Sequence, residues 1–307
     1  MAEMRSSVTI AARERFINTT GRNWERALKG FLNFLGGDAM LIREAKPEDR
    51  PFVEEIARVT WGGKDYVERV FDEWLDDNLY VLEVDGKVIG MAKLTILPGR
   101  VGWLEGLRVH PDYRGRGYGR KLHDFMLGFG ERLARERKIE ALEFATYFLN
   151  RETIGMAERT GFHVKAKFFV FSAKTADFEP EEPTPVEPEM GDLTLGLIPV
   201  GWRFVRRSEE ALGWIKKNAE LYDFYGFRFL VSKKGATFTP LDVGLATLKA
   251  MLPGIAWVAQ ERGRESFDVM LPSGVKPLLP GLKRLGLFLW DETEKPNVLV
   301  FRKRMGN

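Results

Sequence analysis

The chain contains no cysteine and only three histidines among its 307 residues. Without cysteine there can be no disulfide, no thiolate nucleophile and no cysteine-ligated zinc. The histidines, His110, His123 and His163, fall in three different expected elements, so we expect no metal site. Any chemistry must therefore rest on carboxylates, hydroxyls, cationic side chains and backbone groups.

Long apolar runs and a strong charge of one sign are absent as well. No stretch approaches the ~20 apolar residues of a membrane-spanning helix, and no secretory leader is evident. The formal net charge of +3 is slight, so we expect no nucleic-acid partner. We expect a cytoplasmic protein. The length of 307 residues with 44% hydrophobic residues predicts two packed domains.

One stretch combines glycine and arginine in a pattern that predicts an anion site. It follows an expected strand, Val101–Val109, and leads into an expected helix. Glycines let the backbone turn sharply and approach a ligand closely. Free N–H groups and the positive dipole end of the helix favour an anion, and arginine side chains can fork onto phosphate oxygens. These glycines and arginines are Gly115, Gly117, Gly119, Arg114, Arg116 and Arg120.

The residues around this loop extend the pattern. Leu107-x-Val109-x-Pro111-x-x-Arg114-Gly115-x-Gly117-x-Gly119 resembles motif A of the GNAT (Gcn5-related N-acetyltransferase) family. Asn150, followed by ten residues and Gly161-Phe162, resembles motif B of that family. The resemblance covers about residues 40–173 and implies a transferase that uses acetyl-CoA as donor, a primary amine of a small molecule, peptide or protein as acceptor, and no metal.

Periodicity gives an element order of its own. From residue 41 to residue 173 we expect β-α-α-β-β-β-α-β-α-β, which agrees with the GNAT acyl-CoA-binding fold and its mixed, mostly antiparallel sheet. The fold class is thus α/β (α+β), with a further α+β domain toward the C-terminus. There we expect a helix from Thr239-Pro240 to Pro253-Gly254 and a strand over 255–260. A degenerate second GNAT-like unit is one interpretation of this domain.

Composition, periodicity and the resemblance together lead us to expect four segments. Residues 1–39 form a helical extension, either a basic amphipathic anchor or a helix packed on its own domain or an oligomer neighbour. Residues 40–174 form the GNAT domain, and residues 175–192 form an acidic, proline-rich linker, stiff and extended or able to bind a partner. Residues 193–307 form the C-terminal domain. A homodimer is left open.

The resemblance implies which residues bind acetyl-CoA. They are Leu107, Arg108, Val109, Arg114, Gly115, Arg116, Gly117, Tyr118, Gly119, Arg120 and Asn150. The Leu107 N–H would donate to the thioester oxygen, as an oxyanion hole does. An acceptor amine must lose a proton before attack, and Glu105, beside an expected bulge at Gly106, is the preferred general base, with Glu143 as second candidate.

The sequence departs from the family at one position. The tyrosine that often protonates the leaving thiolate lies seven residues after the motif-B asparagine, and that position is Ala157. Either Tyr147 serves as the general acid or no dedicated acid is needed, because a thiol with a pKa of about 8.5 already leaves readily. Two alternatives therefore remain: a non-catalytic acyl-CoA-binding module and a partner-recruiting scaffold.

Overall fold

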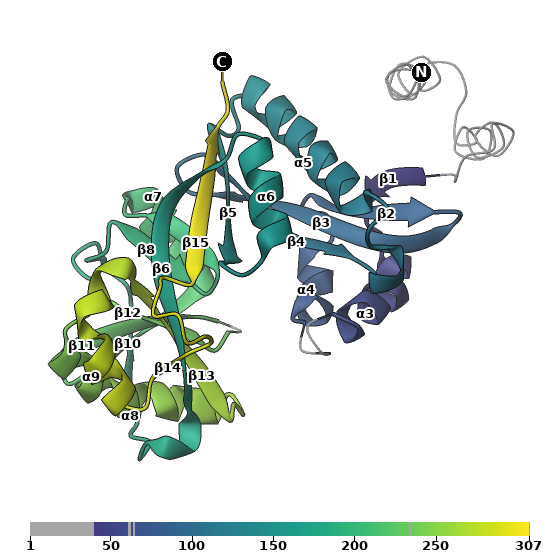
Figure 1. The fold of residues 1–307 in the computed structure, drawn as a ribbon. Helices are drawn as coiled ribbons and strands as arrows, with labels where there is room; N and C mark the ends of the chain where they lie inside the picture. The colour runs from purple at the N-terminus through teal and green to yellow at the C-terminus, as the bar shows by residue number, and fades with distance from the viewer. Residues whose placement is uncertain (1–39, 61–62, 64, 234, 307) are drawn as a thin grey trace, which may run out of the picture. The chain divides into compact units, whose positions relative to one another are not determined.

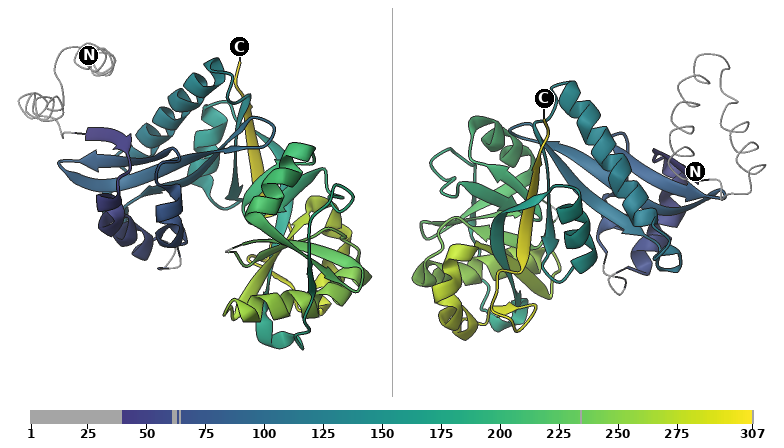
Figure 2. Two further views of the ribbon diagram at one scale, coloured as in Figure 1. Left: turned by 180° about the vertical axis from the view of Figure 1, so that it is seen from behind. Right: turned by 45° about the horizontal axis from the view of Figure 1, so that its top comes forward.

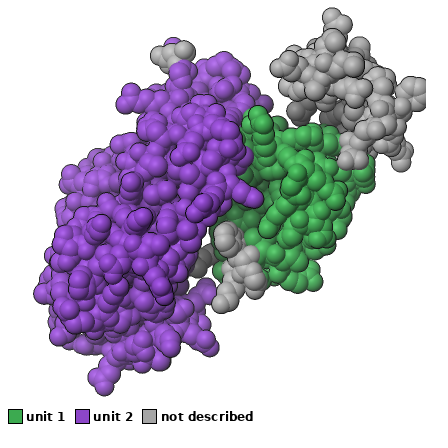
Figure 3. Space-filling view, in the orientation of Figure 1, with its two compact units in different colours: residues 1–93, 106–125 green, residues 94–105, 126–307 purple. Residues whose placement is uncertain are grey.

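The computed structural model describes residues 40–60, 63, 65–233 and 235–306. The helical extension expected for residues 1–39 lies outside the described residues. The chain divides into two compact units (Figure 3). The described residues up to Lys93, together with Gly106–Phe125, form the first unit, and Leu94–Glu105 with the residues from Met126 onward form the second. The four sequence segments predicted above stay a prediction.

The first unit packs two helices on a small antiparallel sheet. Strands β1 (Met40–Glu44), β2 (Leu79–Val84) and β3 (Lys87–Leu97) pair in order, and β4 (Val101–Val109) follows β3. Helices α3 (Arg50–Arg58) and α4 (Val67–Trp74) follow a short 3-10 turn at Pro47–Asp49. Their apolar faces, including Val53, Phe71 and Trp74, form one buried cluster with Val81 and Met91 of the sheet. Asp85 and Gly86 form the hairpin turn between β2 and β3, and both residues have positive φ, as a tight two-residue turn requires.

The glycine–arginine loop leads into a crossover helix whose residues up to Phe125 belong to the first unit and whose remainder belongs to the second. Helix α5 (Tyr118–Arg135) leads from β4 to β5 (Ala141–Tyr147), which lies parallel to β4. Helix α6 (Arg151–Arg159) and strand β6 (His163–Lys174) follow. The order of elements expected for residues 41–173 is therefore confirmed.

The remaining elements mostly extend the same sheet from β6. They are β7 (Thr184–Val186), β8 (Leu197–Val200), β9 (Arg203–Arg206), α7 (Glu209–Asn218), β10 (Ala219–Phe224), β11 (Phe227–Ser232), β12 (Thr237–Pro240), α8 (Leu245–Glu261), β13 (Ser266–Pro272), α9 (Leu279–Arg284), β14 (Phe288–Leu289) and β15 (Val298–Arg304). The strand order from β6 is β13-β12-β11-β10-β7, while β8 and β9 form a separate pair. Strand β7 shows that part of the acidic, proline-rich segment belongs to the sheet.

The last strand of the chain occupies an unexpected place. Strand β15 lies between β5 and β6, antiparallel to both (Figure 1). Strand β6 in turn pairs with β13 through its second half. We call the described residues up to β6 the first half of the chain and those from β7 onward the second half. The first half runs α-β-β-β-α-β-α-β from α4, and the second half repeats this order from α7, apart from the two-residue strand β14. The final strand of each half pairs with the strand that follows the other half's crossover helix, β15 with β5 and β6 with β13.

Helix α8 corrects one expectation. Thr239 and Pro240 belong to strand β12, and the helix begins at Leu245 and continues through Pro253 to Glu261, where a strand was predicted. A proline inside a helix costs ~3 kcal/mol. Burial offsets this cost, because Ile255, Val258 and other apolar residues beyond the proline are buried in the core.

The part of the sheet from β6 to β7 has a buried cluster on each of its faces. Helices α8 and α9 cover one face, where they pack on Phe169, Phe171 and Phe229 (Figure 2). Helix α7 and the β8–β9 pair contribute to the other cluster with Phe168 and Val300. The predicted fold class, a mixed and mostly antiparallel sheet with helices, is confirmed. No helix among the residues described here is long and apolar enough to span a bilayer.

Candidate functional site

The glycine–arginine loop between β4 and α5 is open. Gly115 and Gly117 have φ values of 75° and 80°, the left-handed region that glycine adopts at little cost. A Cβ atom added at either position would meet nothing within 4 Å. Because the first N–H groups of a helix lack intrahelical partners, the loop and the start of α5 present donors toward this open space.

The arginines of the loop differ in their contacts. The Arg114 Nε donates to the Val109 carbonyl at 3.1 Å, and the Arg116 guanidinium lies over the Tyr113 ring. Arg120 is 81% exposed and lies 3.6 Å from Asp124. All three side chains are exposed and keep donors that a phosphate could use. The predicted anion site is therefore not blocked by its own side chains.

Two other predicted binding residues can offer only their backbone. The Arg108 side chain donates to Asp65 at 2.7 Å, and that carboxylate is 0% exposed. The Tyr118 side chain is buried at the start of α5. A ligand at these two positions would therefore meet main-chain groups.

Strand β4 separates from β5 partway along its length. The parallel register covers Val101–Trp103 and ends at Trp103 opposite Glu143. Gly106 has a φ of 68°, and an added Cβ would lie 2.7 Å from the Trp74 ring, so only glycine fits there. The backbone of β4 is therefore irregular at the point where a bulge was expected. Leu107, Arg108 and Val109 lie beyond this irregularity.

Glu105 is ion-paired with the C-terminal half of the chain. Arg203 of β9 forms a two-pronged contact with its carboxylate, at 2.8 Å through Nη2 and 3.1 Å through Nε. The Thr95 hydroxyl also donates to it at 2.5 Å. The Glu105 side chain is only 10% exposed and that of Arg203 is 27% exposed. To accept a proton from an amine, Glu105 would have to share or exchange these contacts.

Glu143, the second candidate base, is more fully enclosed. Its side chain is 1% exposed and lies 2.8 Å from Lys165 and 3.7 Å from Arg206. Arg302 of β15 also donates to it. Burial lowers the pKa of Lys165, and the charges of Arg206 and Arg302 lower it further, against the opposing effect of Glu143. These contacts favour a structural role for Glu143, since three cations already satisfy it.

Tyr147 and Asn150 stand at the end of β5 and the start of α6. The Tyr147 hydroxyl donates to Asp291 at 2.9 Å, and burial together with this carboxylate raises the tyrosine's pKa above its usual range. The phenol therefore keeps its proton. The Asn150 side chain caps α6 by accepting from the Thr153 N–H. Ala157, at the family tyrosine position, is fully buried.

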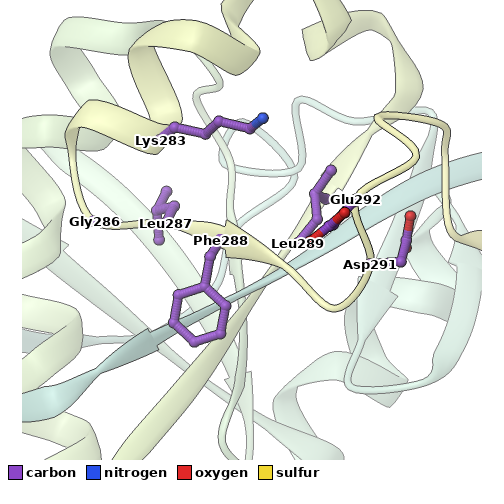
Figure 4. A pocket seen from close by; sticks show the side chains of 7 residues that line it. All are labelled: Lys283, Gly286, Leu287, Phe288, Leu289, Asp291 and Glu292. Atoms are coloured by element: carbon purple, nitrogen blue, oxygen red, sulfur yellow. The ribbon is translucent and has the colours of Figure 1, made fainter.

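A surface pocket lies in another part of the second unit. It is formed by α9, β14 and the segment after it, with Asp291 and Glu292 on one side and Lys283 on the other (Figure 4). None of the predicted CoA-binding residues lines it. Among the described residues, no group of three or more acidic or histidine side chains could hold a metal ion.

The predicted site residues are divided between the two units. Leu107 and the loop through Arg120 belong to the first, whereas Glu105, Tyr147 and Asn150 belong to the second. Sequence analysis missed the partners of the two candidate catalytic side chains, which are Arg203 and Thr95 for Glu105 and Asp291 for Tyr147. Arg203 is 98 residues from Glu105, so no local pattern could have identified the pair.

Comparison with known proteins agrees with this geometry. Residues 45–162 match the model of the acetyltransferase (GNAT) family. A curated protein of Xenopus tropicalis named histidine N-acetyltransferase is 34% identical over 110 residues, which are 31% of this chain and 34% of that protein. The chain thus spans about a third of the length of this relative.

Two solved structures resemble nearly the whole chain. A GCN5-related N-acetyltransferase from Sphaerobacter thermophilus has a TM-score of 0.59 at 15% identity, covering 87% of this chain and 96% of that one. A structure from Thermoplasma acidophilum has a TM-score of 0.58 at 20% identity, covering 86% and 99%. At 15–20% sequence identity, these similarities establish a shared fold alone.

The loop between β4 and α5, the order of elements around it and the match to the family model all fall in the same stretch. Residues 45–162 of this chain therefore form a domain of the acetyltransferase (GNAT) family.

Proposed function

We propose that the protein is an acetyl-CoA-dependent N-acetyltransferase that moves an acetyl group onto a primary amine by direct attack. The observation that carries this proposal is the open, cationic loop between β4 and α5 within a GNAT domain. The curated relative acts, by its name, on histidine. Free amino acids are therefore among the candidate acceptors.

The donor's diphosphate would be held by the loop. The N–H groups from Gly115 through Gly119 and the dipole of α5 favour an anion, and Arg116 and Arg120 add exposed positive charge. Acetyl-CoA, when bound, supplies a thioester whose carbonyl carbon is open to attack. Because the amine attacks this carbon directly, no residue of the chain needs to be acetylated during transfer.

The edge of β4 beyond Trp103 would bind the rest of the donor. Because the β4–β5 register ends at that residue, an extended ligand could pair with the Leu107–Val109 backbone in the manner of an added strand. The Leu107 and Val109 carbonyls accept from the Arg108 and Arg114 side chains, so a ligand would share or replace these contacts. The Leu107 N–H would donate to the thioester oxygen as charge develops on it. Losing such a donor typically costs ~3 kcal/mol of transition-state stabilisation.

Glu105 would take the proton from the acceptor amine, directly or through water. Its position two residues before Leu107 puts a carboxylate on the same strand as the proposed oxyanion donor. Its contact with Arg203 keeps the side chain in one orientation. The same contact competes with the acceptor amine for the carboxylate oxygens. Tyr147 is a weak candidate for the acid, because Asp291 holds its proton.

A non-catalytic acyl-CoA-binding module is the second candidate. It is favoured by Ala157, which is fully buried and has no hydroxyl to protonate a leaving thiolate. In that case CoA would bind and no amine would be acetylated.

Calorimetry with CoA, followed by mass spectrometry of amine libraries incubated with acetyl-CoA, separates the two candidates. Glu105→Gln should leave CoA affinity unchanged and lower kcat by ~10²–10⁴-fold if the carboxylate is the base. Tyr147→Phe should lower kcat by less than about 10-fold. Tight CoA binding without any acetylated product would support the second candidate, and absence of CoA binding would contradict both.

A further inference from the structure

Four cationic side chains gather around the two candidate catalytic carboxylates. Arg203 contacts Glu105, while Lys165, Arg206 and Arg302 contact Glu143. The two carboxylates belong to neighbouring strands, since Glu143 is opposite Trp103 in the parallel register. Within this group of six, which we call the β4–β5 charge cluster, positive charges exceed negative charges by two.

Two of these cations are accessible from outside. The side chain of Arg203 is 27% exposed and that of Arg206 is 50% exposed, whereas Lys165 and Arg302 are 14% and 17% exposed. Both accessible arginines come from β9, which pairs only with β8 in the described part of the sheet. Strand β9 thus carries two guanidinium groups to the edge of the cluster.

The contact between Arg203 and Glu105 is geometrically specific. Both guanidinium nitrogens that point at Glu105 lie within hydrogen-bond distance of a separate carboxylate oxygen. Such a two-pronged contact is the arrangement by which arginine recognises carboxylates generally. The same face of the guanidinium could therefore bind a ligand carboxylate in the same geometry.

We propose that Arg203, supported by Arg206, binds a carboxylate of the acceptor, so that the acceptor belongs to the α-amino acid class. This inference rests on the proposed function and specifies its substrate. The acceptor's ammonium group would approach Glu105 while its carboxylate approaches Arg203. An ammonium without a carboxylate would raise the excess positive charge of the cluster from two to three, whereas a zwitterion leaves it at two.

Charge compensation explains why a zwitterion suits this site. Opening a partly buried ion pair is costly when one partner is left without a counter-charge. A ligand that carries both charges replaces each partner of the Glu105–Arg203 pair with an equivalent one. In the transfer, the ammonium first gives one proton to Glu105, which passes it to solvent, and the neutral amine nitrogen then bonds to the acetyl carbon. The carbon–sulfur bond breaks, the nitrogen loses its second proton to Glu105, and the thiolate takes up a proton from solvent.

The test compares matched acceptors on the full chain. Each L-amino acid, its α-carboxamide and its decarboxylated amine are assayed at saturating acetyl-CoA, with the product identified by mass spectrometry. We expect the KM of the preferred amino acid to be about 10- to 100-fold below that of its carboxamide, the range for losing a hydrogen-bonded charge pair.

Variants at Arg203 show whether that residue carries the preference. Arg203→Gln should raise the KM of the amino acid about 10- to 100-fold and change the KM of the carboxamide little, while CoA affinity is retained. Arg203→Lys should restore part of the preference, because it keeps the charge without the fork. Arg207→Gln, at an exposed neighbouring arginine, is the matched control and should leave the preference unchanged.

The outcomes separate the inference from the proposed function. Equal KM values for amino acids and carboxamides, with acetylated product from both, would overturn the inference and leave the transferase assignment standing. The same holds if Arg203→Gln or, should that variant fail to fold, Arg203→Lys keeps the full preference. CoA binding without product from any amine would overturn both.

Discussion

The two halves of the chain contain the same crossover with different loops. In the first half β4 and β5 lie parallel and are joined through α5, and in the second half β12 and β13 lie parallel and are joined through α8. The first loop has left-handed glycines at 115 and 117 with open space around them. In the second, Gly244 has a φ of −66° and an added Cβ would lie 3.0 Å from Thr247.

The charge at the start of the two helices also differs. Arg116 and Arg120 flank the start of α5, whereas Asp242 precedes α8 and accepts from the Gly244 N–H and the Thr247 hydroxyl. The positive end of α8 is thus already stabilised by a carboxylate of its own chain. Helix α8 is also buried along much of its length, which suits a packing element. We therefore propose an anion site only at the first of the two crossovers, where the loop is open and cationic.

The largest expected effect concerns a feature that the two halves share, namely that the last strand of each pairs with a strand of the other. The prediction tests this for β15. Phe301 of β15 is fully buried and stacks on Phe144 of β5 with ring centroids 5.1 Å apart. Phe301→Ala should reduce the free energy of unfolding by ~3–5 kcal/mol, because it removes a large side chain from a packed core. Chemical denaturation measures this loss.

The exposed residue Arg304 of the same strand provides the control. Arg304→Ala should change the free energy of unfolding by no more than about 0.5 kcal/mol. A loss below about 1 kcal/mol for Phe301→Ala would mean that β15 contributes little to the first half, contrary to the exchange described here.

The second prediction fills the open space at the loop between β4 and α5, the feature that distinguishes the first half. Gly117→Leu places a side chain in the open space and in a left-handed conformation, which costs ~1–2 kcal/mol for a residue with a Cβ. We expect CoA affinity to fall about 100-fold, measured by calorimetry, because several backbone donors become inaccessible at once.

Gly226 in the β10–β11 hairpin is a matched position in the second half. Its φ is 85°, and an added Cβ there also meets nothing within 4 Å. Gly226→Leu should therefore have a similar effect on stability and none on CoA affinity. If the two variants bind CoA equally well, the loop of the first half is not the phosphate site.

The third prediction removes charge from the same loop. Arg116→Ala should weaken CoA binding about 10-fold at low salt and less at high salt, since an exposed arginine–phosphate contact is screened. Arg135→Ala, an exposed arginine at the other end of α5, should leave the affinity unchanged. An equal loss from both variants would indicate a general effect of net charge, without a local contact.

The comparison of the halves also shows what sequence can predict. The loop, the strands of the first half and the GNAT fold could be predicted from patterns within about 120 residues. In that stretch the spacing of apolar residues indicates the strands and helices, and the positions of glycine indicate the turns. The contact of Arg203 with Glu105 joins residues 98 positions apart. The insertion of β15 brings Arg302 to Glu143, 159 positions apart, and neither contact leaves a local pattern in the sequence. Pro253 misled the prediction of α8 because burial outweighed the local preference of proline.

The smallest expected effect concerns the second crossover. Asp242→Ala removes the carboxylate that accepts from Gly244 and Thr247 at the start of α8, so the free energy of unfolding should fall by about 1 kcal/mol. CoA affinity should not change, because this helix start is not the proposed anion site. Asp242→Asn keeps an acceptor oxygen and should lose less than the alanine variant. If Asp242→Ala instead created or strengthened CoA binding, the second crossover would have retained a phosphate site masked only by its own carboxylate, and the contrast between the halves would rest on that single charge.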